Sequence, residues 1–173
     1  MSGDTDVVTN QFTLINEQET INLAHAFAFA CEATNAVNKG LIVYLKGDLG
    51  AGKSFFSRAF IQNFLPGQKV KSPTYTIVES YKTSTVTIHH FDLYRLCDPE
   101  ELEYLAIRDL LMGSYVALVE WPQKGEPIFP EADVVIELQH PQEFESENRR
   151  VEMTASSVLG GAVVEQLMMN MRK

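Results

Sequence analysis

The segment Gly47-Asp48-Leu49-Gly50-Ala51-Gly52-Lys53-Ser54 carries the residue types that bind nucleoside polyphosphates. Its spacing fits the phosphate-loop pattern G-x-x-x-x-G-K-[S/T], in which glycines let backbone amides approach phosphate oxygens. In this pattern the lysine reaches the β- and γ-phosphates, and the hydroxyl of the last residue binds Mg²⁺. We therefore expect Lys53 to contact phosphate and Ser54 to be a magnesium ligand, with all of residues 47 to 54 binding the nucleotide.

Two carboxylates, Asp92 and Glu120, each end an apolar stretch that we expect to be a strand. In segment 86–92 the two-residue repeat of a strand places Ile88, His90 and Asp92 on one face. Ligands of α/β sheets bind beyond the carboxyl ends of the strands, so both acids suit a role in positioning metal or water. A surface acid that begins a loop explains each carboxylate equally well when it is taken alone. A lone histidine such as His90 is usually a hydrogen-bonded structural residue.

A phosphate loop needs a strand before it and a helix after it, and the sequence predicts both. The apolar run 41–46 is typical of a strand buried on both faces, and 55–65 is typical of a helix. Further strands are expected at 11–15, 75–81, 85–91, 115–119, 134–138 and 150–154, and further helices at 16–38, from 98 onwards and at 160–171. The predicted fold is therefore α/β, a single P-loop NTPase-like domain in which helices flank a mixed central β-sheet.

Three of these helices carry more specific signals. Asn16 and Glu19 form the sequence pattern of a capping box at the start of the helix that we expect to reach about Asn38. Asp98 precedes a proline and two acids, which is typical of a helix start. The C-terminal helix is expected to bury one apolar face, made by Val164, Leu167, Met168 and Met171.

Length and composition limit the class of protein. The chain has 173 residues, 45% of them hydrophobic, and a formal net charge of −9, as expected for one acidic globular domain. We expect residues 1–10 to be a flexible tail and 11–173 to form the domain. The basic residues are scattered, which argues against independent nucleic-acid binding. Neither a signal peptide nor a membrane-spanning run is present in the sequence, so the cytoplasm is the expected compartment.

Signatures of several other nucleotide-binding classes are absent from the sequence. No N-K-x-D segment follows the phosphate loop, so the base-recognition signature of GTPases is missing. The arginines do not cluster after the loop, whereas a small-molecule kinase usually needs an arginine-bearing lid over the phosphates. The sequence favours an ATPase that serves another protein. A small-molecule P-loop kinase and a nucleotide-gated binding module remain alternatives.

Four segments together resemble the TsaE (YjeE) family, the bacterial ATPases of the tRNA threonylcarbamoyladenosine pathway. They are the phosphate loop, Lys71-Ser72-Pro73-Thr74-Tyr75-Thr76, His90-Phe91-Asp92-Leu93-Tyr94-Arg95-Leu96 and Val119-Glu120-Trp121-Pro122. Their order and spacing are similar to those of the family, and the resemblance extends from about Gln11 to Thr154. It implies a domain that binds ATP and Mg²⁺ and has low ATPase activity alone. It also implies that the protein acts with the TsaB and TsaD proteins to support their turnover. It implies contact with tRNA only through that complex, and no association with a membrane.

The resemblance also implies roles for individual residues. Lys53 contacts phosphates, Ser54 and Glu120 hold Mg²⁺, and Asp92 assists the metal or a water molecule. Lys53, Asp92 and Glu120 are therefore the expected catalytic residues. Phe55 stands where the family often has a second threonine, but Ser54 keeps the ligating hydroxyl.

Three further positions are assigned to the nucleotide by the resemblance alone. Thr74 lies in a segment that is similar to the family's switch-like loop near the γ-phosphate. Trp121, the only tryptophan, matches a tryptophan at the family's nucleotide and partner face, although packing against a pocket wall is the simpler expectation. Glu17 lies where the N-terminal segment of the family approaches the nucleotide.

Overall fold

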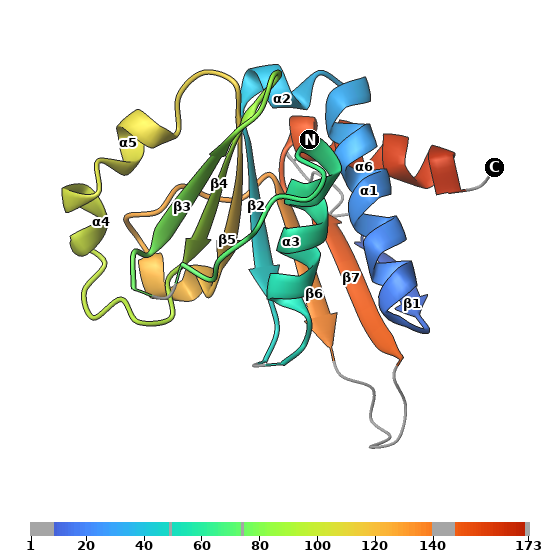
Figure 1. The fold of residues 1–173 in the computed structure, drawn as a ribbon, viewed down its shortest axis with the longest axis horizontal. Helices are drawn as coiled ribbons and strands as arrows, with labels where there is room; N and C mark the ends of the chain where they lie inside the picture. The colour runs from blue at the N-terminus through green and yellow to red at the C-terminus, as the bar shows by residue number, and fades with distance from the viewer. Residues whose placement is uncertain (1–8, 49, 74, 140–147, 172–173) are drawn as a thin grey trace, which may run out of the picture.

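The computed structural model describes residues 9–48, 50–73, 75–139 and 148–171 of the chain. A seven-stranded sheet forms its centre, with the strand order β1-β7-β6-β2-β5-β4-β3 (Figure 1). The strands are β1 (Thr9–Leu14), β2 (Leu41–Lys46), β3 (Val78–Lys82), β4 (Thr87–Asp92), β5 (Tyr115–Glu120), β6 (Val134–Gln139) and β7 (Arg149–Ala155). The central strands β6, β2, β5 and β4 are parallel, and antiparallel strands lie at both edges. The predicted α/β fold with a mixed sheet is confirmed.

Helices cover the two faces of the sheet unequally. The helices are α1 (Glu17–Ala33), α2 (Ala36–Lys39), α3 (Lys53–Phe64), α4 (Glu101–Tyr104), α5 (Ile107–Leu110), the 3₁₀ helix η1 (Pro122–Gly125) and α6 (Val158–Met171). Side chains of α1, α3 and α6 form one core with alternate residues of the central strands. The opposite face of the sheet packs against α4, α5 and the segment after η1. None of the described helices is long and apolar enough to span a bilayer.

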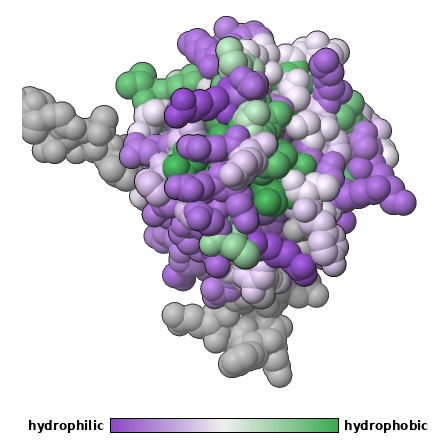
Figure 2. All heavy atoms as spheres, turned by 90° about the vertical axis from the view of Figure 1, so that its left-hand side faces the viewer, coloured by the Kyte–Doolittle hydropathy of each residue, from purple (hydrophilic) through white to green (hydrophobic). Residues whose placement is uncertain are grey.

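The face that carries α4, α5 and the edge strand β3 exposes apolar side chains. Figure 2 shows this face, on which green hydrophobic patches lie between hydrophilic residues. Tyr104 in α4 is 90% exposed and Met112, just after α5, is 68% exposed. Two one-turn helices cover less of a sheet than long helices do, so part of this core reaches the surface.

The predicted helix from residue 16 to 38 is interrupted, so the prediction of one continuous helix is wrong. α1 ends at Ala33 and α2 begins at Ala36. The Thr34 hydroxyl donates to the Ala30 carbonyl at 2.7 Å, and Asn35 adopts a left-handed conformation with φ of 63°. Both features end a helix locally, and the sequence contains no glycine or proline there to signal the break.

The start of α1 follows the prediction closely. Asn16 Oδ1 accepts a hydrogen bond from the Glu19 amide at 2.9 Å, as expected for a helix cap. The Glu19 carboxylate accepts from the Ile15 amide at 2.7 Å, one residue before the cap rather than at the cap itself. β1 begins at Thr9, and residues 1–8 of the expected tail lie outside the described part of the chain.

The helix expected after Asp98 is also divided. Asp98 accepts hydrogen bonds from the amides of Glu100 and Glu101, but helical structure begins at Glu101 and stops at Tyr104. Ala106 then takes a left-handed conformation with φ of 50° before α5. The acidic start therefore caps a turn that leads into two short helices.

Two further predictions are correct only in part. The strand expected at 75–81 begins at Val78, because the Ile77 amide donates to the Pro73 carbonyl in a turn where Ile77 has φ of 67°. In α6, Val164 and Leu167 are buried and Met168 packs against the core, whereas Met171 is 44% exposed and does not join them.

Candidate functional site

The carboxyl ends of β2, β4 and β5 meet at one edge of the sheet, because these strands are parallel neighbours. Glu120, the last residue of β5, pairs in register with Leu45 of β2 on one side and with Asp92 of β4 on the other. The phosphate loop leaves β2 at this edge and leads into α3. The structure thus brings both predicted carboxylates to the loop, although 28 positions separate them in the sequence (92 to 120).

The described part of the phosphate loop has a backbone that glycine alone adopts easily. Gly47, Gly50 and Gly52 have φ of 145°, 80° and 106°. A Cβ atom on Gly47 would lie 2.4 Å from the Leu138 carbonyl oxygen, so a side chain does not fit there. The Ala51 amide donates to the Asp48 carbonyl at 3.0 Å, which tightens the turn. Leu49, which was also predicted to bind nucleotide, lies outside the described residues.

Helix α3 starts directly after the loop, at Lys53 rather than at the predicted Phe55. Its first backbone hydrogen bond runs from the Phe56 amide to the Gly52 carbonyl at 2.9 Å. The amides before this point have no partner within the helix, and with the helix dipole they favour an anion at this end. The strand–loop–helix arrangement that a phosphate loop requires is therefore present.

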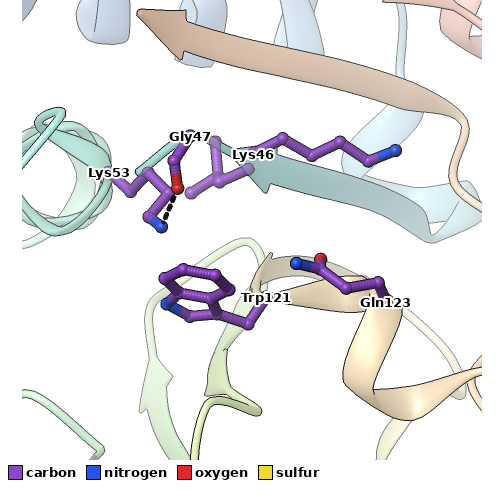
Figure 3. A pocket seen from close by; sticks show the side chains of 6 residues that line it. Lys46, Gly47, Lys53, Trp121 and Gln123 are labelled. Carbon is purple, nitrogen blue, oxygen red and sulfur yellow. Dashed lines mark hydrogen bonds between the residues drawn. The ribbon is translucent and has the colours of Figure 1, made fainter. Parts of the chain in front are cut away.

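Lys53 is 5% exposed and lies between the loop and Trp121. Its ammonium donates to the Gly47 carbonyl at 2.5 Å and lies 3.9 Å from the centre of the Trp121 ring. Figure 3 shows both side chains facing a small cavity of about 200 Å³, which Lys46 and Gln123 also line. Burial lowers the pKa of Lys53, while the nearby charges of Glu120, Asp92 and Asp48 act in the opposite direction.

Trp121 has a backbone conformation that is rare for a residue with a side chain. Its φ is 57°, in the left-handed region that costs free energy outside glycine. This turn directs the chain from the end of β5 into η1 and places the half-buried indole against Lys53. The ring forms a wall of the cavity, in keeping with the packing role expected for it.

Ser54 and Glu120 form a hydrogen-bonded pair across the site. The Ser54 hydroxyl lies 3.2 Å from Oε1 and 3.3 Å from Oε2 of Glu120, and the carboxylate is buried at 3% exposure. A hydroxyl has one proton to donate and two lone pairs, so Ser54 can donate to Glu120 and still present oxygen to a metal ion. The two residues that the sequence predicts as magnesium ligands are therefore brought together.

Asp92 lies beside this pair and is half-buried. One of its carboxylate oxygens accepts a hydrogen bond from the Tyr94 amide at 3.0 Å. Burial is the main cause that raises the pKa of Asp92, and Glu120 adds to the effect. The Tyr94 amide, His90 and Lys53 act to lower it.

The oxygen ligands at this edge suit a magnesium ion that is also bound by phosphates. No group of three or more His, Cys, Asp or Glu side chains that could hold a metal occurs among the described residues. Mg²⁺ is usually bound through one or two carboxylates together with phosphate oxygens and water, so a full set of protein ligands is not needed. Ser54, Glu120 and Asp92 provide the hydroxyl and carboxylates that such a site requires.

A larger cavity of about 800 Å³ borders the phosphate loop at Gly50, Ala51 and Gly52. It is lined by the start of α1, the loop and α3, and by two residues of the β6–β7 pair: Asn16, Glu17, Gln18, Thr20, Gly50, Ala51, Gly52, Phe55, Leu138 and Arg149. Glu17 therefore lies close to the loop, although 29 positions separate it from Lys46 at the end of β2 (17 to 46). Its contact with a nucleotide stays a prediction of the family resemblance.

Sequence reasoning gave no role in the site to several residues that the structure places there. Phe55 and Arg149 line the large cavity, and His90 contacts Glu120 at 2.6 Å. The pleat of β4 places His90 on the same face as Asp92, and this pattern was the available signal for that contact. No sequence pattern marks Arg149, because β7 reaches the site only through sheet pairing. Thr74 lies outside the described residues.

Comparison with known proteins gives a consistent result. Residues 14–151 match the family model described as "Threonylcarbamoyl adenosine biosynthesis protein TsaE". The tRNA threonylcarbamoyladenosine biosynthesis protein TsaE of Haemophilus influenzae is 44% identical over 126 residues, which cover 73% of this chain and 77% of the relative. The protein of the same name from Bacillus subtilis is 32% identical over 128 residues, covering 74% and 80%.

A solved structure supports the fold independently. The crystal structure of YdiB from Bacillus subtilis superimposes with a TM-score of 0.75 at 23% sequence identity, and the match covers 95% of this chain and 97% of YdiB. The family model spans most of the chain, including the phosphate loop and both strand-end carboxylates. This chain belongs to the TsaE family.

Proposed function

We propose that this protein is a Mg²⁺-dependent ATPase that supports the threonylcarbamoyladenosine modification of tRNA, acting with TsaB and TsaD. The observation that carries the proposal is the convergence of Lys53, Ser54, Asp92 and Glu120 at one edge of the sheet, next to a glycine-rich loop. Membership of the TsaE family supports the pathway, because the family is described by threonylcarbamoyl adenosine biosynthesis. ATP activity and the partners come from the sequence pattern and the family resemblance.

Each group has a role that follows from its chemistry. The loop amides and the start of α3 bind phosphate oxygens, and Lys53 neutralises phosphate charge. Ser54 and Glu120 hold Mg²⁺, which supplies electrostatic stabilisation to the phosphates when it is bound. Asp92 orients the metal or an attacking water molecule, and its raised pKa makes it a stronger base than an exposed aspartate.

The cavity beside Glu17 is suited to the nucleoside part of ATP. Its volume of about 800 Å³ lies within the usual range for small-molecule sites, and it borders the phosphate loop directly. Phe55 offers an aromatic surface, and Asn16 and Gln18 offer polar groups. We assign the base and ribose to this cavity and the phosphates to the loop.

Release of phosphate from ATP tests the proposal directly. The protein alone is expected to hydrolyse ATP slowly and to be stimulated by TsaB and TsaD from the same organism. Lys53→Ala and Glu120→Ala each remove a group that stabilises transition-state charge, so each is expected to lower phosphate release about 10²-fold or more. Lys82→Ala is the matched control, because it changes an exposed lysine that pairs with Thr87, at the end of β4 opposite Asp92.

Reconstituted tRNA modification separates a direct chemical role from a supporting one. We expect this protein to be needed for repeated turnover by TsaB and TsaD and not for the first round. Phosphate release that does not change when the partners are added would contradict the proposal. Stoichiometric phosphoryl transfer to a metabolite would instead identify a small-molecule kinase, and tight nucleotide binding without hydrolysis would identify a nucleotide-gated binding module.

A further inference from the structure

His90 is buried next to Glu120 and has no assigned role in the function proposed above. Its side chain is 1% exposed, and Nε2 lies 2.6 Å from Oε2 of Glu120. The pleat of β4 puts His90 between Ile88 and Asp92 on the face of the sheet that α3 covers. The ring therefore lies beneath the carboxylates at the strand ends, away from solvent.

The hydrogen bond between His90 and Glu120 has a defined direction. An ionised carboxylate only accepts hydrogen bonds, so Nε2 is the nitrogen that donates. Nδ1 is buried and has no hydrogen-bond partner among the described residues. Glu120 is accordingly the one hydrogen-bond partner of the ring within the described part of the chain.

The neighbouring histidine shows that this contact is specific to one position. His89 is also buried, but it lies on the opposite face of β4, and its Nδ1 is 2.7 Å from the Ser80 hydroxyl on the edge strand β3. Its ring packs near Phe91 and Tyr115. His89 thus resembles the structural histidine that the sequence led us to expect at His90.

Glu120 needs a fixed orientation because two elements approach it. The Ser54 hydroxyl lies almost equally far from the two carboxylate oxygens, at 3.2 and 3.3 Å, so it does not distinguish them. His90 contacts Oε2 alone and leaves Oε1 with free lone pairs. A buried carboxylate also loses much of its hydration, and a donor that belongs to a rigid central strand offsets part of that cost.

We propose that His90 is a positioning residue, which donates from Nε2 to one oxygen of Glu120 so that the other oxygen faces the magnesium ion of the bound nucleotide. The inference rests on the proposed Mg²⁺–ATP function and adds a residue to it. Residues that orient a metal ligand commonly change metal affinity about 10- to 100-fold when they are replaced. The expected effect of losing His90 is therefore on metal-dependent binding.

The test compares nucleotide affinity with and without metal. A non-hydrolysable ATP analogue is titrated into the intact protein by calorimetry, first with excess Mg²⁺ and then with EDTA, and the ratio of the two affinities is the readout. His90→Leu is expected to lower this ratio about tenfold while leaving the affinity in EDTA nearly unchanged. In His90→Gln the side-chain amide can still donate to Glu120, so the ratio is expected to stay within about threefold of the wild type.

His89→Leu is the matched control, because it also removes a buried imidazole from β4 but does not touch Glu120. Its thermal stability is expected to fall while its affinity ratio stays at the wild-type value. If His90→Leu does not fold, His90→Asn takes its place, since the shorter amide does not reach as far as Nε2. A wild-type ratio in the folded Leu or Asn variant overturns the inference. A wild-type protein whose affinity does not respond to Mg²⁺ overturns the proposed metal site instead.

Discussion

At the scale of single residues, the site places one buried cation among several groups of opposite charge. Lys53 contacts the Gly47 carbonyl and the Trp121 ring, and Asp48, Asp92 and Glu120 act on its charge from a greater distance. Burial lowers the pKa of Lys53 and raises that of Asp92. Both shifts disfavour the charged form, as is common for ionisable groups at functional sites.

Trp121 is expected to report the position of Lys53 by its fluorescence. It is the only tryptophan, and the Lys53 ammonium lies 3.9 Å from its ring centre. A phosphate contact would compete with this cation–π contact, so adding Mg²⁺–ATP is expected to change the emission spectrum. Lys53→Met is expected to shift the emission of the free protein and to abolish most of the change on nucleotide addition. A response of wild-type size in that variant would show that the nucleotide acts on the indole without Lys53.

Asp92→Asn is expected to stabilise the protein at neutral pH when metal and nucleotide are absent. The pKa of Asp92 is higher in the folded than in the unfolded chain, so the native state loses stability as the pH rises from about 3.8, the ordinary pKa of aspartate, through the raised pKa of the folded state. Asparagine avoids this loss. The gain is expected to be about 0.5 kcal/mol, since the half-buried carboxyl is still partly solvated. Urea unfolding in EDTA at several pH values measures it.

The pH dependence distinguishes this electrostatic effect from a change in packing. The difference between Asp92→Asn and wild type is expected to vanish below about pH 3.8, where the carboxyl is protonated in both states. A difference that stays constant across the whole pH range would show that the amide changes packing or hydrogen bonding. A lower stability of the variant at neutral pH would show that its bond with the Tyr94 amide outweighs the cost of burial.

At the scale of elements, Asp133 joins the central strand to the C-terminal helix. Its backbone amide donates to the Ile42 carbonyl and its carboxylate accepts from the Ile42 amide, both at 2.8 Å. The same carboxylate accepts from the Ser157 hydroxyl at 2.7 Å, and Ser157 in turn accepts from the Gly160 amide at 2.9 Å. Helix α6 is thereby capped and anchored where β6 begins.

Two adjacent glycines of α6 are expected to respond to alanine in opposite directions. A Cβ atom on Gly160 would lie 1.9 Å from the Asp133 carbonyl oxygen, so α6 would have to move away from β6. Gly160→Ala is expected to cost about 1–3 kcal/mol through overpacking. A Cβ atom on Gly161 would meet no atom within 4 Å among the described residues. Gly161→Ala is therefore expected to gain about 0.5–1 kcal/mol from helix propensity.

Thermal unfolding of both variants checks this contrast. One kcal/mol corresponds to about 2–4 °C for a chain of this size, so the two melting temperatures should move apart measurably. The Gly161→Ala variant also controls for the general effect of alanine in α6. Equal destabilisation of both variants would contradict the proposed close approach of α6 to Asp133.

The elements near the phosphate loop were largely predictable, whereas helix interruptions were not. The run 41–45 is apolar because β2 is buried between parallel neighbours, and the sequence shows such a run directly. The break after Ala33 depends on a side-chain hydrogen bond of Thr34 and on a left-handed Asn35, and both residue types also occur inside continuous helices. The partners of Asp133 are up to 91 positions away, so no local pattern indicates them.

Within the site, too, some residues could be predicted from the sequence and others could not. Glycine spacing and strand-end acids identify Lys53, Ser54, Asp92 and Glu120, because short patterns encode them. The side-chain contacts of His90 and Arg149 depend on which strands are neighbours and which faces meet. Those contacts become visible only when the sheet order is known.

At the scale of the whole molecule, the two faces of the sheet differ in how firmly they are covered. The face under α1, α3 and α6 holds the larger core, in which the Phe27 ring contacts those of Phe56 and Phe60. The opposite face is covered by short helices, and apolar side chains reach its surface (Figure 2). Opening of the larger core therefore requires separation of long helices from the sheet, a more global event than loss of α4 or α5.

The rates of thiol labelling of the two cysteines are expected to show how firmly the larger core is closed. Cys97 is exposed, whereas Cys31 in α1 is fully buried in the larger core. Burial raises the pKa of the Cys31 thiol, with a smaller contribution from Glu32, and the thiolate is the reactive form. In native buffer the Cys97 thiol should react quickly with an aromatic disulfide reagent. The Cys31 thiol should react only when the larger core opens.

Denaturant dependence tests whether that opening is global. In Cys97→Ser, which leaves Cys31 alone, the labelling rate should rise with urea concentration with the slope of global unfolding, because exposure of Cys31 requires α1 to leave the sheet. Gly161→Ala should slow the reaction and Gly160→Ala should speed it, since α6 packs against α1 in the same core. Rapid labelling of Cys31 without urea, or a slope much smaller than that of global unfolding, would show that α1 detaches locally while the rest of the sheet stays folded.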